Sequence, residues 1–241
     1  MTRPPFDWRH FDAYLFDIDG TLANTRGGVH YNSFHRALRE VYACNGRIDA
    51  VPVHGNTDIG ILRAALAHHD QLTDDFERLL PRARELMCAE VARNAADLQV
   101  ELCPAILELL AELRREGKLL GVVTGNFEQI GWRKLERGGI RQFFDFGSFS
   151  DHREKREDIF RRGIELARQL RGPETTVCFI GDTPSDIRAA ARLGVPVIAV
   201  ATGIYSLDEL AKEAPTICIR TCDELSGIGD VRTRSSSKYS E

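Results

Sequence analysis

Acidic and hydroxyl side chains follow short apolar stretches at three places in this sequence, and a basic cluster lies between the second and the third. The four segments are Asp17-Ile18-Asp19-Gly20-Thr21, Thr124-Gly125-Asn126, Arg153-Glu154-Lys155-Arg156 and Gly181-Asp182-Thr183-Pro184-Ser185-Asp186. The apolar stretches before the first, second and fourth segments have the composition of buried strands. Because the carboxyl ends of parallel strands share one edge of a sheet, we expect these side chains to converge.

Carboxylates that converge repel one another, and the pKa of at least one of them rises unless a cation neutralises them. Oxygen ligands favour a hard ion, and Mg²⁺ held by one or two carboxylates together with a substrate phosphate is the usual arrangement. The residue types therefore predict a Mg²⁺ site among these acids.

Each side chain suits one task in phosphoryl transfer. Asp17 ends a rigid strand and can attack phosphorus, since carboxylates form aspartyl-phosphates. Asp19 follows past a glycine turn and can protonate the leaving alcohol and later activate water. Thr124 and the backbone amides of Gly125 and Asn126 can bind phosphoryl oxygens at the start of a helix. A cation from the basic cluster would offset the charge of the nucleophile and the phosphoryl group.

Strands and helices alternate over most of the chain. We expect strands at 13–18, 119–124, 143–146, 176–180 and 195–200, and helices at 105–116, 127–137, 158–170 and 185–193. Strands that are apolar on both faces and alternate with helices indicate a parallel sheet covered by helices. The predicted fold class is α/β, with a doubly wound, Rossmann-like parallel sheet as the core and a small α-helical cap inserted after the first strand.

The insertion is predicted from residues 27–96, where apolar residues recur at helical spacing and no convincing strand interrupts them. An insertion just after a strand's carboxyl end would lie over the edge where such sheets bind ligands. We therefore divide the chain into a core of 1–24 and 100–228, a cap of 25–99, and a polar tail of 229–241 that we expect to be disordered.

Helix capping can by itself account for two of the polar clusters. In the cap, Asn56 or Thr57 can be the N-cap of a helix with Asp58 favoured by its dipole, and the alternative is a loop that reaches the substrate. Thr183 can likewise cap a helix with Pro184 at its first position. For both clusters a capping role and a functional role therefore stay open.

Composition excludes several classes of protein. The chain has 241 residues, and its 32 basic and 36 acidic residues leave a net charge of −4, which implies no general affinity for nucleic acid or membrane surfaces. No apolar run approaches the roughly 20 residues that span a bilayer, and the N-terminus has no signal-peptide core. The six cysteines lack zinc-site or CxxC spacing. We expect buried thiols at Cys178 and Cys218 and a cytoplasmic protein.

The order and chemistry of the four segments resemble the motifs of the haloacid dehalogenase superfamily: DxDGT, a strand-end Thr or Ser, Lys or Arg, and GDxxxD. The chain is most similar to the phosphoglycolate phosphatase-like branch, in which a helical cap separates the first two motifs. This resemblance implies that Asp17 is the nucleophile, Asp19 the acid/base and Thr124 a phosphate-binding residue. It also implies Mg²⁺ held by Asp17, the Asp19 carbonyl and Asp182, with Asp186 supporting the site indirectly or through water.

The third motif departs from the family's pattern, which is usually Lys-Pro followed by a helix. Here no proline is present, and three cations compete for the position. Lys155 has the commoner residue type, whereas Arg156 occupies the place where arginine variants carry it. We prefer Arg156, and Lys155 and Arg153 stay open as alternatives.

The function predicted is a Mg²⁺-dependent phosphomonoester hydrolase that acts on a small phosphorylated metabolite through an aspartyl-phosphate. Asp19 argues against the dehalogenase subgroup, and the absence of lysine from 27–96 argues against a phosphonate-cleaving relative with a Schiff-base lysine in its cap. Neither GxxxxGK[ST] nor GxGxxG occurs, which argues against a kinase or a dehydrogenase. The alternatives are a phosphomutase similar to β-phosphoglucomutase and a catalytically idle protein that binds a phosphorylated ligand. The substrate and the oligomeric state stay open.

Overall fold

The computed structural model describes residues 6–225. Its helices are α1 (Val29–Tyr42), α2 (Asp58–His68), α3 (Phe76–Arg93), α4 (Ile106–Arg115), α5 (Glu128–Arg137), α6 (Arg156–Arg171), α7 (Pro184–Leu193) and α8 (Leu207–Lys212). Its strands are β1 (Ala13–Phe16), β2 (Ala23–Arg26), β3 (Gln99–Leu102), β4 (Leu119–Val123), β5 (Phe146–Ser148), β6 (Val177–Gly181), β7 (Val197–Val200) and β8 (Ile217–Ile219). The predicted tail at 229–241 lies outside the described residues.

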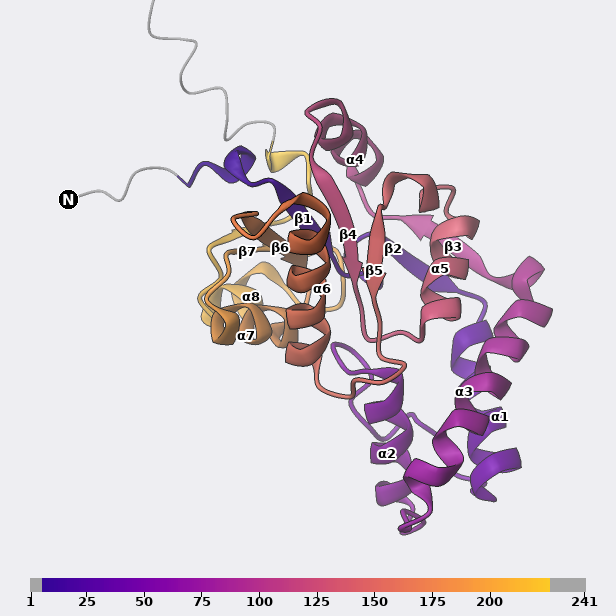
Figure 1. Cartoon of the computed structure of the whole chain (residues 1–241). Coiled ribbons are helices and arrows are strands. Elements are labelled where there is room, and N and C mark those ends of the chain that lie inside the picture. Colours follow the sequence, from indigo (N-terminus) through magenta and orange to yellow (C-terminus); the bar gives the residue numbers. More distant parts are fainter. Residues whose placement is uncertain (1–5, 226–241) are drawn as a thin grey trace, which may run out of the picture.

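A parallel sheet of six strands in the order β5-β4-β1-β6-β7-β8 forms the centre of the molecule (Figure 1). Strand β1 lies between β4 and β6, so that Tyr14 pairs with Leu120 on one side and with Cys178 on the other. The chain winds outward from β1 in both directions. The strand order therefore reverses at β1, and open α/β sheets bind their ligands at the carboxyl edge of such a point.

Alternate residues of β1 face two separate hydrophobic cores. Tyr14 and Phe16 pack on the side covered by α4 and α5, whereas Ala13 and Leu15 pack on the side covered by α6, α7 and α8. All four residues of β1 are buried, as expected for a parallel strand covered on both faces. The predicted doubly wound α/β fold is confirmed.

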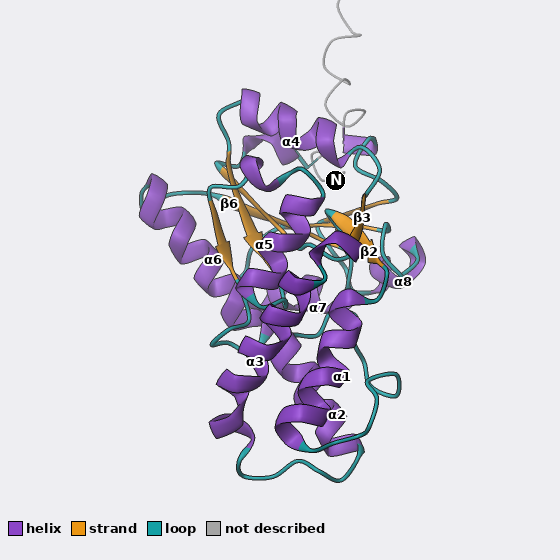
Figure 2. Ribbon diagram, turned by 90° about the vertical axis from the view of Figure 1, so that its right-hand side faces the viewer, coloured by secondary structure: helices purple, strands orange, loops and turns teal. Residues whose placement is uncertain are grey.

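Helices α1, α2 and α3 pack against one another around a third core, which includes Leu38, Leu62 and Met87. Figures 1 and 2 show them grouped together below the sheet. Phe127 and Ile130, at the start of α5, join this core. The helical insertion is thus packed directly onto the segment that follows β4.

A two-stranded antiparallel ribbon of β2 and β3 connects the sheet to the helical insertion, with Ala23 opposite Leu102 and Arg26 opposite Gln99. This ribbon was not predicted, because each strand is only four residues long and carries several exposed polar side chains. The strand expected at 143–146 is also misplaced. Arg141–Phe143 forms a 3₁₀ turn, and β5 begins only at Phe146.

The last two elements, α8 and β8, were missed as well, since both are short. All six cysteines are free thiols. Cys178 is buried as expected, but Cys218 is partly exposed because β8 is the edge strand of the sheet. In the described part of the chain, no helix is both long and apolar enough to cross a bilayer.

Candidate active site

Asp17 lies at the carboxyl end of β1 and begins a tight turn. The carbonyl of Ile18 accepts hydrogen bonds from the amides of Thr21, Leu22 and Ala23, which closes the turn. Gly20 has a φ of +85°, a conformation in which side chains with a Cβ are strained. The turn buries Asp17, which is 4% exposed, and leaves Asp19 partly exposed.

Asp182 and Asp186 lie on the turn from β6 into α7. Thr183 is the N-cap: its hydroxyl contacts the Asp186 amide, while the Asp186 carboxylate accepts from the Thr183 amide, and Pro184 follows at the first helical position. This is the capping arrangement expected from the sequence. Capping does not use the whole Asp186 side chain, because its second carboxylate oxygen contacts Arg156.

Arg156, in the first turn of α6, joins two of these acids. Its Nη2 lies 2.7 Å from Asp17 Oδ2 and 2.6 Å from Asp186 Oδ1, and its side chain is only 9% exposed. Burial opposes the charge of the guanidinium, but these two carboxylates outweigh burial and raise the pKa of Arg156. Lys155 is the N-cap of α6 and is exposed, and Arg153 lies in a separate surface hollow. Of the three candidate cations, only Arg156 contacts Asp17.

Three buried carboxylates meet beside Arg156. One oxygen from each of Asp17, Asp182 and Asp186 lies within 4.8 Å of the others. Burial, together with the charges of Asp186 and Asp19, raises the pKa of Asp17 to about 6 despite the attraction of Arg156. Burial and the neighbouring carboxylates also raise the pKa of Asp182 well above its usual value. A single guanidinium therefore leaves this cluster short of positive charge.

The surroundings of Asp182 suit a small hard cation. A Cβ at Gly20 or at Gly203 would overlap the Asp182 carboxylate, so two glycines make room for it. The hydroxyl of Thr21 donates to Asp182 Oδ1 at 2.9 Å and holds the carboxylate in place. Carboxylate oxygens crowded into a confined space are the kind of donor that Mg²⁺ accepts, and the cation would offset their mutual repulsion. The residues present fit the metal predicted from the sequence.

The side chain of Asp19 turns away from this cluster toward Lys134, a residue that sequence reasoning missed. Lys134 Nζ lies 2.8 and 2.6 Å from the two carboxylate oxygens of Asp19 and donates to Asn126 Oδ1 at 2.6 Å. Burial raises the pKa of Asp19, but the ion pair with Lys134 and a hydrogen bond from Asn126 lower it below its usual value. The signal was present in the sequence: Lys134 follows Ile130 by four residues and so lies on the buried face of α5.

Asn126 links Asp19 to the residues after β4. Its side-chain nitrogen donates 2.8 Å hydrogen bonds to Asp19 Oδ2 and to Thr124 Oγ1. Thr124 is held in turn by a hydrogen bond from its amide to Ser148 O. Gly125 lies against the helical insertion, where a Cβ would overlap the backbone of Asn56. Thr124, Gly125 and Asn126, predicted from sequence as substrate-binding residues, all line the same cavity as Asp17 and Asp19.

The insertion reaches the core through the start of α2. Thr57 is the N-cap of α2, and its hydroxyl accepts from the Gly60 amide. Asp58 does more than favour the helix dipole. Its amide donates to Gly125 O at 2.7 Å, and its carboxylate accepts from the Phe127 amide at 2.8 Å. The expected capping by Thr57 is thus present, and the loop also borders the cavity, while its contact with a substrate stays a prediction.

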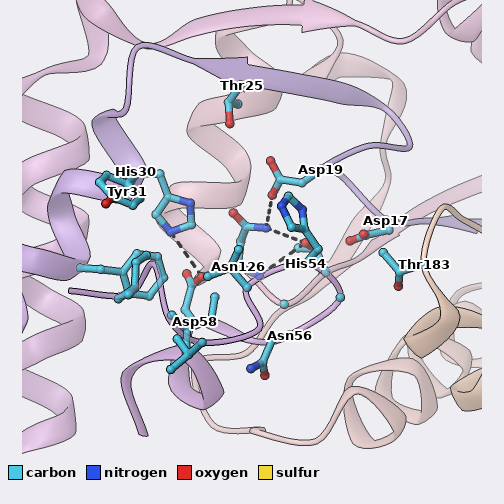
Figure 3. A pocket seen from close by; sticks show the side chains of 18 of the residues that line it. Asp17, Asp19, Thr25, His30, Tyr31, His54, Asn56, Asp58, Asn126 and Thr183 are labelled. Atoms are coloured by element: carbon cyan, nitrogen blue, oxygen red, sulfur yellow. Dashed lines mark hydrogen bonds and ion pairs between the residues drawn. The ribbon is translucent and has the colours of Figure 1, made fainter. Parts of the chain in front are cut away.

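These contacts enclose a cavity of about 420 Å³ between the insertion and the sheet edge (Figure 3). Figure 3 shows Asp17 and Asp19 facing it from the core, and His30, Tyr31, His54, Asn56 and Asp58 from the insertion. His30 Nε2 lies 3.3 Å from Asp58 Oδ1. His54 is exposed and also lines the cavity. The turn after β1, the start of α1 and the loop before α2 thus meet at one cavity.

The match to a family model agrees with this geometry. Residues 14–200 match the model described as haloacid dehalogenase-like hydrolase. This span begins within β1 and ends with β7, so it includes every segment that contributes a side chain to the carboxylate cluster.

Curated relatives cover most of the chain. Pyrophosphatase PpaX of Halalkalibacterium halodurans is 27% identical over 227 residues, which cover 92% of this chain and 99% of the relative. Phosphoglycolate phosphatase of Synechococcus elongatus is 26% identical over 227 residues, covering 88% and 94%. Tyrosine-protein kinase PtkA of Mycobacterium tuberculosis is 30% identical over 218 residues, covering 88% of this chain and 70% of that protein.

Solved structures share the fold. CbbY of Rhodobacter sphaeroides, in complex with xylulose 1,5-bisphosphate, superposes with a TM-score of 0.64 at 22% identity and covers 88% of this chain and 94% of that chain. At this identity the likeness concerns the fold alone.

The crowding of Asp182 has a measurable consequence for stability. Each unit by which burial raises the pKa of a carboxyl costs about 1.4 kcal/mol of stability at neutral pH. Asp182→Asn removes that charge and keeps an oxygen for Thr21. In EDTA at pH 7.5 we expect this variant to melt at least about 2 °C above the wild type, as measured by calorimetry.

Asp74→Asn, which removes an exposed acid, is the matched control and should not shift the melting temperature. Addition of Mg²⁺ should stabilise the wild type more than Asp182→Asn, since a ligand stabilises only the fold that binds it. A lower melting temperature for Asp182→Asn in EDTA would show that the carboxylate cluster is not strained by its own charge.

Proposed function

The chain belongs to the haloacid dehalogenase-like hydrolase family, and we propose that it is a Mg²⁺-dependent phosphatase that hydrolyses small phosphorylated metabolites through an aspartyl-phosphate on Asp17. The relatives named phosphatase and pyrophosphatase support hydrolysis of phosphoryl groups. The observation that carries the proposal is the position of Asp17. Its buried carboxylate lines the cavity floor, with one oxygen on Arg156.

In the first half-reaction an Asp17 oxygen attacks phosphorus, and the bond between phosphorus and the leaving-group oxygen breaks. The leaving oxygen takes a proton from Asp19, which also lines the cavity. In the second half-reaction Asp19 takes a proton from water, the water oxygen attacks phosphorus, and the bond to Asp17 breaks. Inorganic phosphate and free Asp17 result, so atoms and protons balance over the cycle.

The ion pair with Lys134 keeps Asp19 ionised, which is the state a general base requires. To act as the acid, Asp19 must first take a proton. A phosphate group in the cavity favours this, because a nearby negative charge raises a carboxyl pKa. Lys134 and Asn126 keep the Asp19 side chain in one position for its roles as acid and as base. We therefore propose that Lys134 positions the acid/base.

The phosphoryl group would be bound by groups that already converge. Arg156 offsets the charge of the nucleophile and the phosphoryl oxygens, and Thr124 with the amides of Gly125 and Asn126 can bind those oxygens. Asp17, Asp182 and the main-chain carbonyl of Asp19 would hold the metal, with Asp186 supporting it through Arg156 or water. When bound, Mg²⁺ would neutralise the carboxylate cluster and the phosphate oxygens.

Asp17→Asn tests the nucleophile. The amide is a poor nucleophile and a poor metal ligand, so turnover of p-nitrophenyl phosphate with Mg²⁺ should fall more than roughly 10³-fold. EDTA should silence the wild type, and added Mg²⁺ should restore it. Asp74→Asn, the same change at an exposed position, should retain full turnover. Undiminished activity in Asp17→Asn would sink the assignment.

Alanine variants of the three neighbouring cations test the third motif. Arg156→Ala should lower kcat by on the order of 10²-fold or more, because a charge that stabilises the transition state is lost. Lys155→Ala and Arg153→Ala should change kcat less than about twofold, since neither side chain contacts Asp17 and salt screens charges at the surface. Arg156→Lys keeps a buried cation, so it separates catalysis from folding. Its melting temperature should stay closer to that of the wild type than its kcat does. Three mild effects would show that the positive charge comes from elsewhere.

A double-mutant cycle of Asp19→Asn and Lys134→Met tests the acid/base and its holder. Single-turnover phosphorylation should slow more with benzyl phosphate than with p-nitrophenyl phosphate in Asp19→Asn, because only the alkoxide needs a proton. Lys134→Met should lower kcat roughly tenfold or more by misplacing Asp19.

If Lys134 acts through Asp19, then Lys134→Met should have little further effect in the Asp19→Asn background. Arg133→Met, which removes an exposed cation on the same helix, is the control. Additive losses, or equal damage to both leaving groups, would contradict the assigned roles.

A further inference from the structure

The insertion contributes a group of apolar side chains to the cavity, beside the polar residues His30, Asp49, His54, Asn56 and Asp58. Six side chains form this apolar wall: Tyr31, Phe34, Ile48, Val51, Val53 and Ile61. Phe34, Ile48 and Ile61 are 3%, 3% and 6% exposed, so they are fixed parts of the cap core and not mobile surface groups. An apolar leaving group that lies against this wall is favoured, because its apolar surface is removed from water.

The cations of the cavity are already committed to core acids. Of the residues that line it, only Lys134 and Arg156 are lysine or arginine, and both come from the core. Lys134 is paired with Asp19, and Arg156 with Asp17 and Asp186. No lysine or arginine of the insertion lines the cavity, so a second anionic group on the substrate would find no unused cation of these types there.

The insertion instead brings two acids to the same cavity, Asp49 and Asp58. Asp58 is buried between the Phe127 amide and His30, and Asp49 is paired with Arg47, which does not line the cavity. A carboxylate or second phosphate on the leaving group would lie near these two acids, of which Asp58 is buried and Asp49 is exposed. Like charges in such proximity disfavour the binding of a second anionic group.

One polar group on this side lacks a hydrogen bond. His30 Nε2 is buried and, although it lies 3.3 Å from Asp58 Oδ1, makes no hydrogen bond within residues 6–225. A buried nitrogen without a partner is unfavourable, and a hydroxyl or ether oxygen on the leaving group would satisfy it. His30 thus offers one unsatisfied polar contact beside the apolar wall.

Given the phosphatase function proposed above, on which this step rests, we propose that the substrate is a phosphate monoester whose leaving group is uncharged, mainly apolar and about the size of a ring. A cavity of about 420 Å³ lies in the range of roughly 300–1,000 Å³ that holds drug-sized ligands, so a very small leaving group would leave most of it empty. Metabolites with a carboxylate or a second phosphate are poor substrates for this site.

A matched substrate series tests the proposal in the intact chain with Mg²⁺. Benzyl phosphate, its 4-carboxy derivative and 1,4-benzenedimethanol bisphosphate all release a primary benzylic oxygen, and the last two carry an added anionic group at the para position. The kcat/KM for benzyl phosphate should exceed that for each of the other two at least about tenfold. It should also exceed that for phosphoglycolate, whose leaving group is both small and charged.

Val53→Arg places a cation on the apolar wall. It should lower the ratio of kcat/KM for benzyl phosphate to kcat/KM for its 4-carboxy derivative by about tenfold or more. Leu72→Arg adds the same charge at a position 40% exposed and outside the cavity, so its preference should equal that of the wild type. Turnover of p-nitrophenyl phosphate, which needs no acid, reports whether each variant has folded.

The outcomes separate the two proposals. Faster turnover of the carboxylated or bisphosphorylated compound by the wild type would overturn the substrate class and leave the phosphatase intact. Stimulation of phosphate transfer by a sugar bisphosphate would overturn the phosphatase function in favour of a phosphomutase. If no monoester, p-nitrophenyl phosphate included, is hydrolysed with Mg²⁺, the proposed function itself fails.

Discussion

The crowding of Asp17, Asp182 and Asp186 around one guanidinium is the constraint on which the rest of the site depends. Buried like charges are costly, and Arg156 offsets only part of that cost, as the raised pKa values of Asp17 and Asp182 indicate. The arrangement persists because β1, β6 and the start of α6 are fixed by a core that is buried on both faces of the sheet. The stability of the α/β core thus holds together a cluster of acids whose repulsion a bound metal cation would relieve.

The same edge of the sheet fixes where the helical insertion can lie. Gly125 permits the backbone before α2 to approach the segment after β4, and Asp58 then binds the amide of Phe127. An ion pair between Arg63 and Glu154 and a hydrogen bond from Thr57 to Glu154 O add contacts beside the start of α6. Of the residues in these contacts, Gly125 and Asp58 line the cavity. In the proposed function, the insertion would therefore exclude water from the phosphoryl group and supply a wall against the leaving group.

How far the sequence predicts this protein depends on whether a residue's role is local. The strands ending at Asp17, Thr124 and Asp182 could be found because short apolar stretches and strand-end polar residues are local signals, and a parallel sheet then brings them together. Lys134 was missed because its partner, Asp19, lies on a different element, and a lysine on a helix is normally solvated.

Other features depended on tertiary contacts in the same way. The preference for Arg156 over Lys155 could not be derived from spacing, since it depends on which side of α6 faces Asp17. The β2–β3 ribbon is stabilised by its own pairing and by the elements it connects, and its two short strands carry little apolar pattern.

The central claim, that Asp17 carries the phosphoryl group, is tested most directly in the Asp19→Asn variant, in which hydrolysis of the intermediate is slowed. A single turnover of this variant is quenched with acid, and its peptides are analysed by mass spectrometry. The account predicts that the peptide containing Asp17 gains one phosphoryl group in step with release of the alcohol. Release of the alcohol and of free phosphate together, with that peptide unmodified, would contradict it.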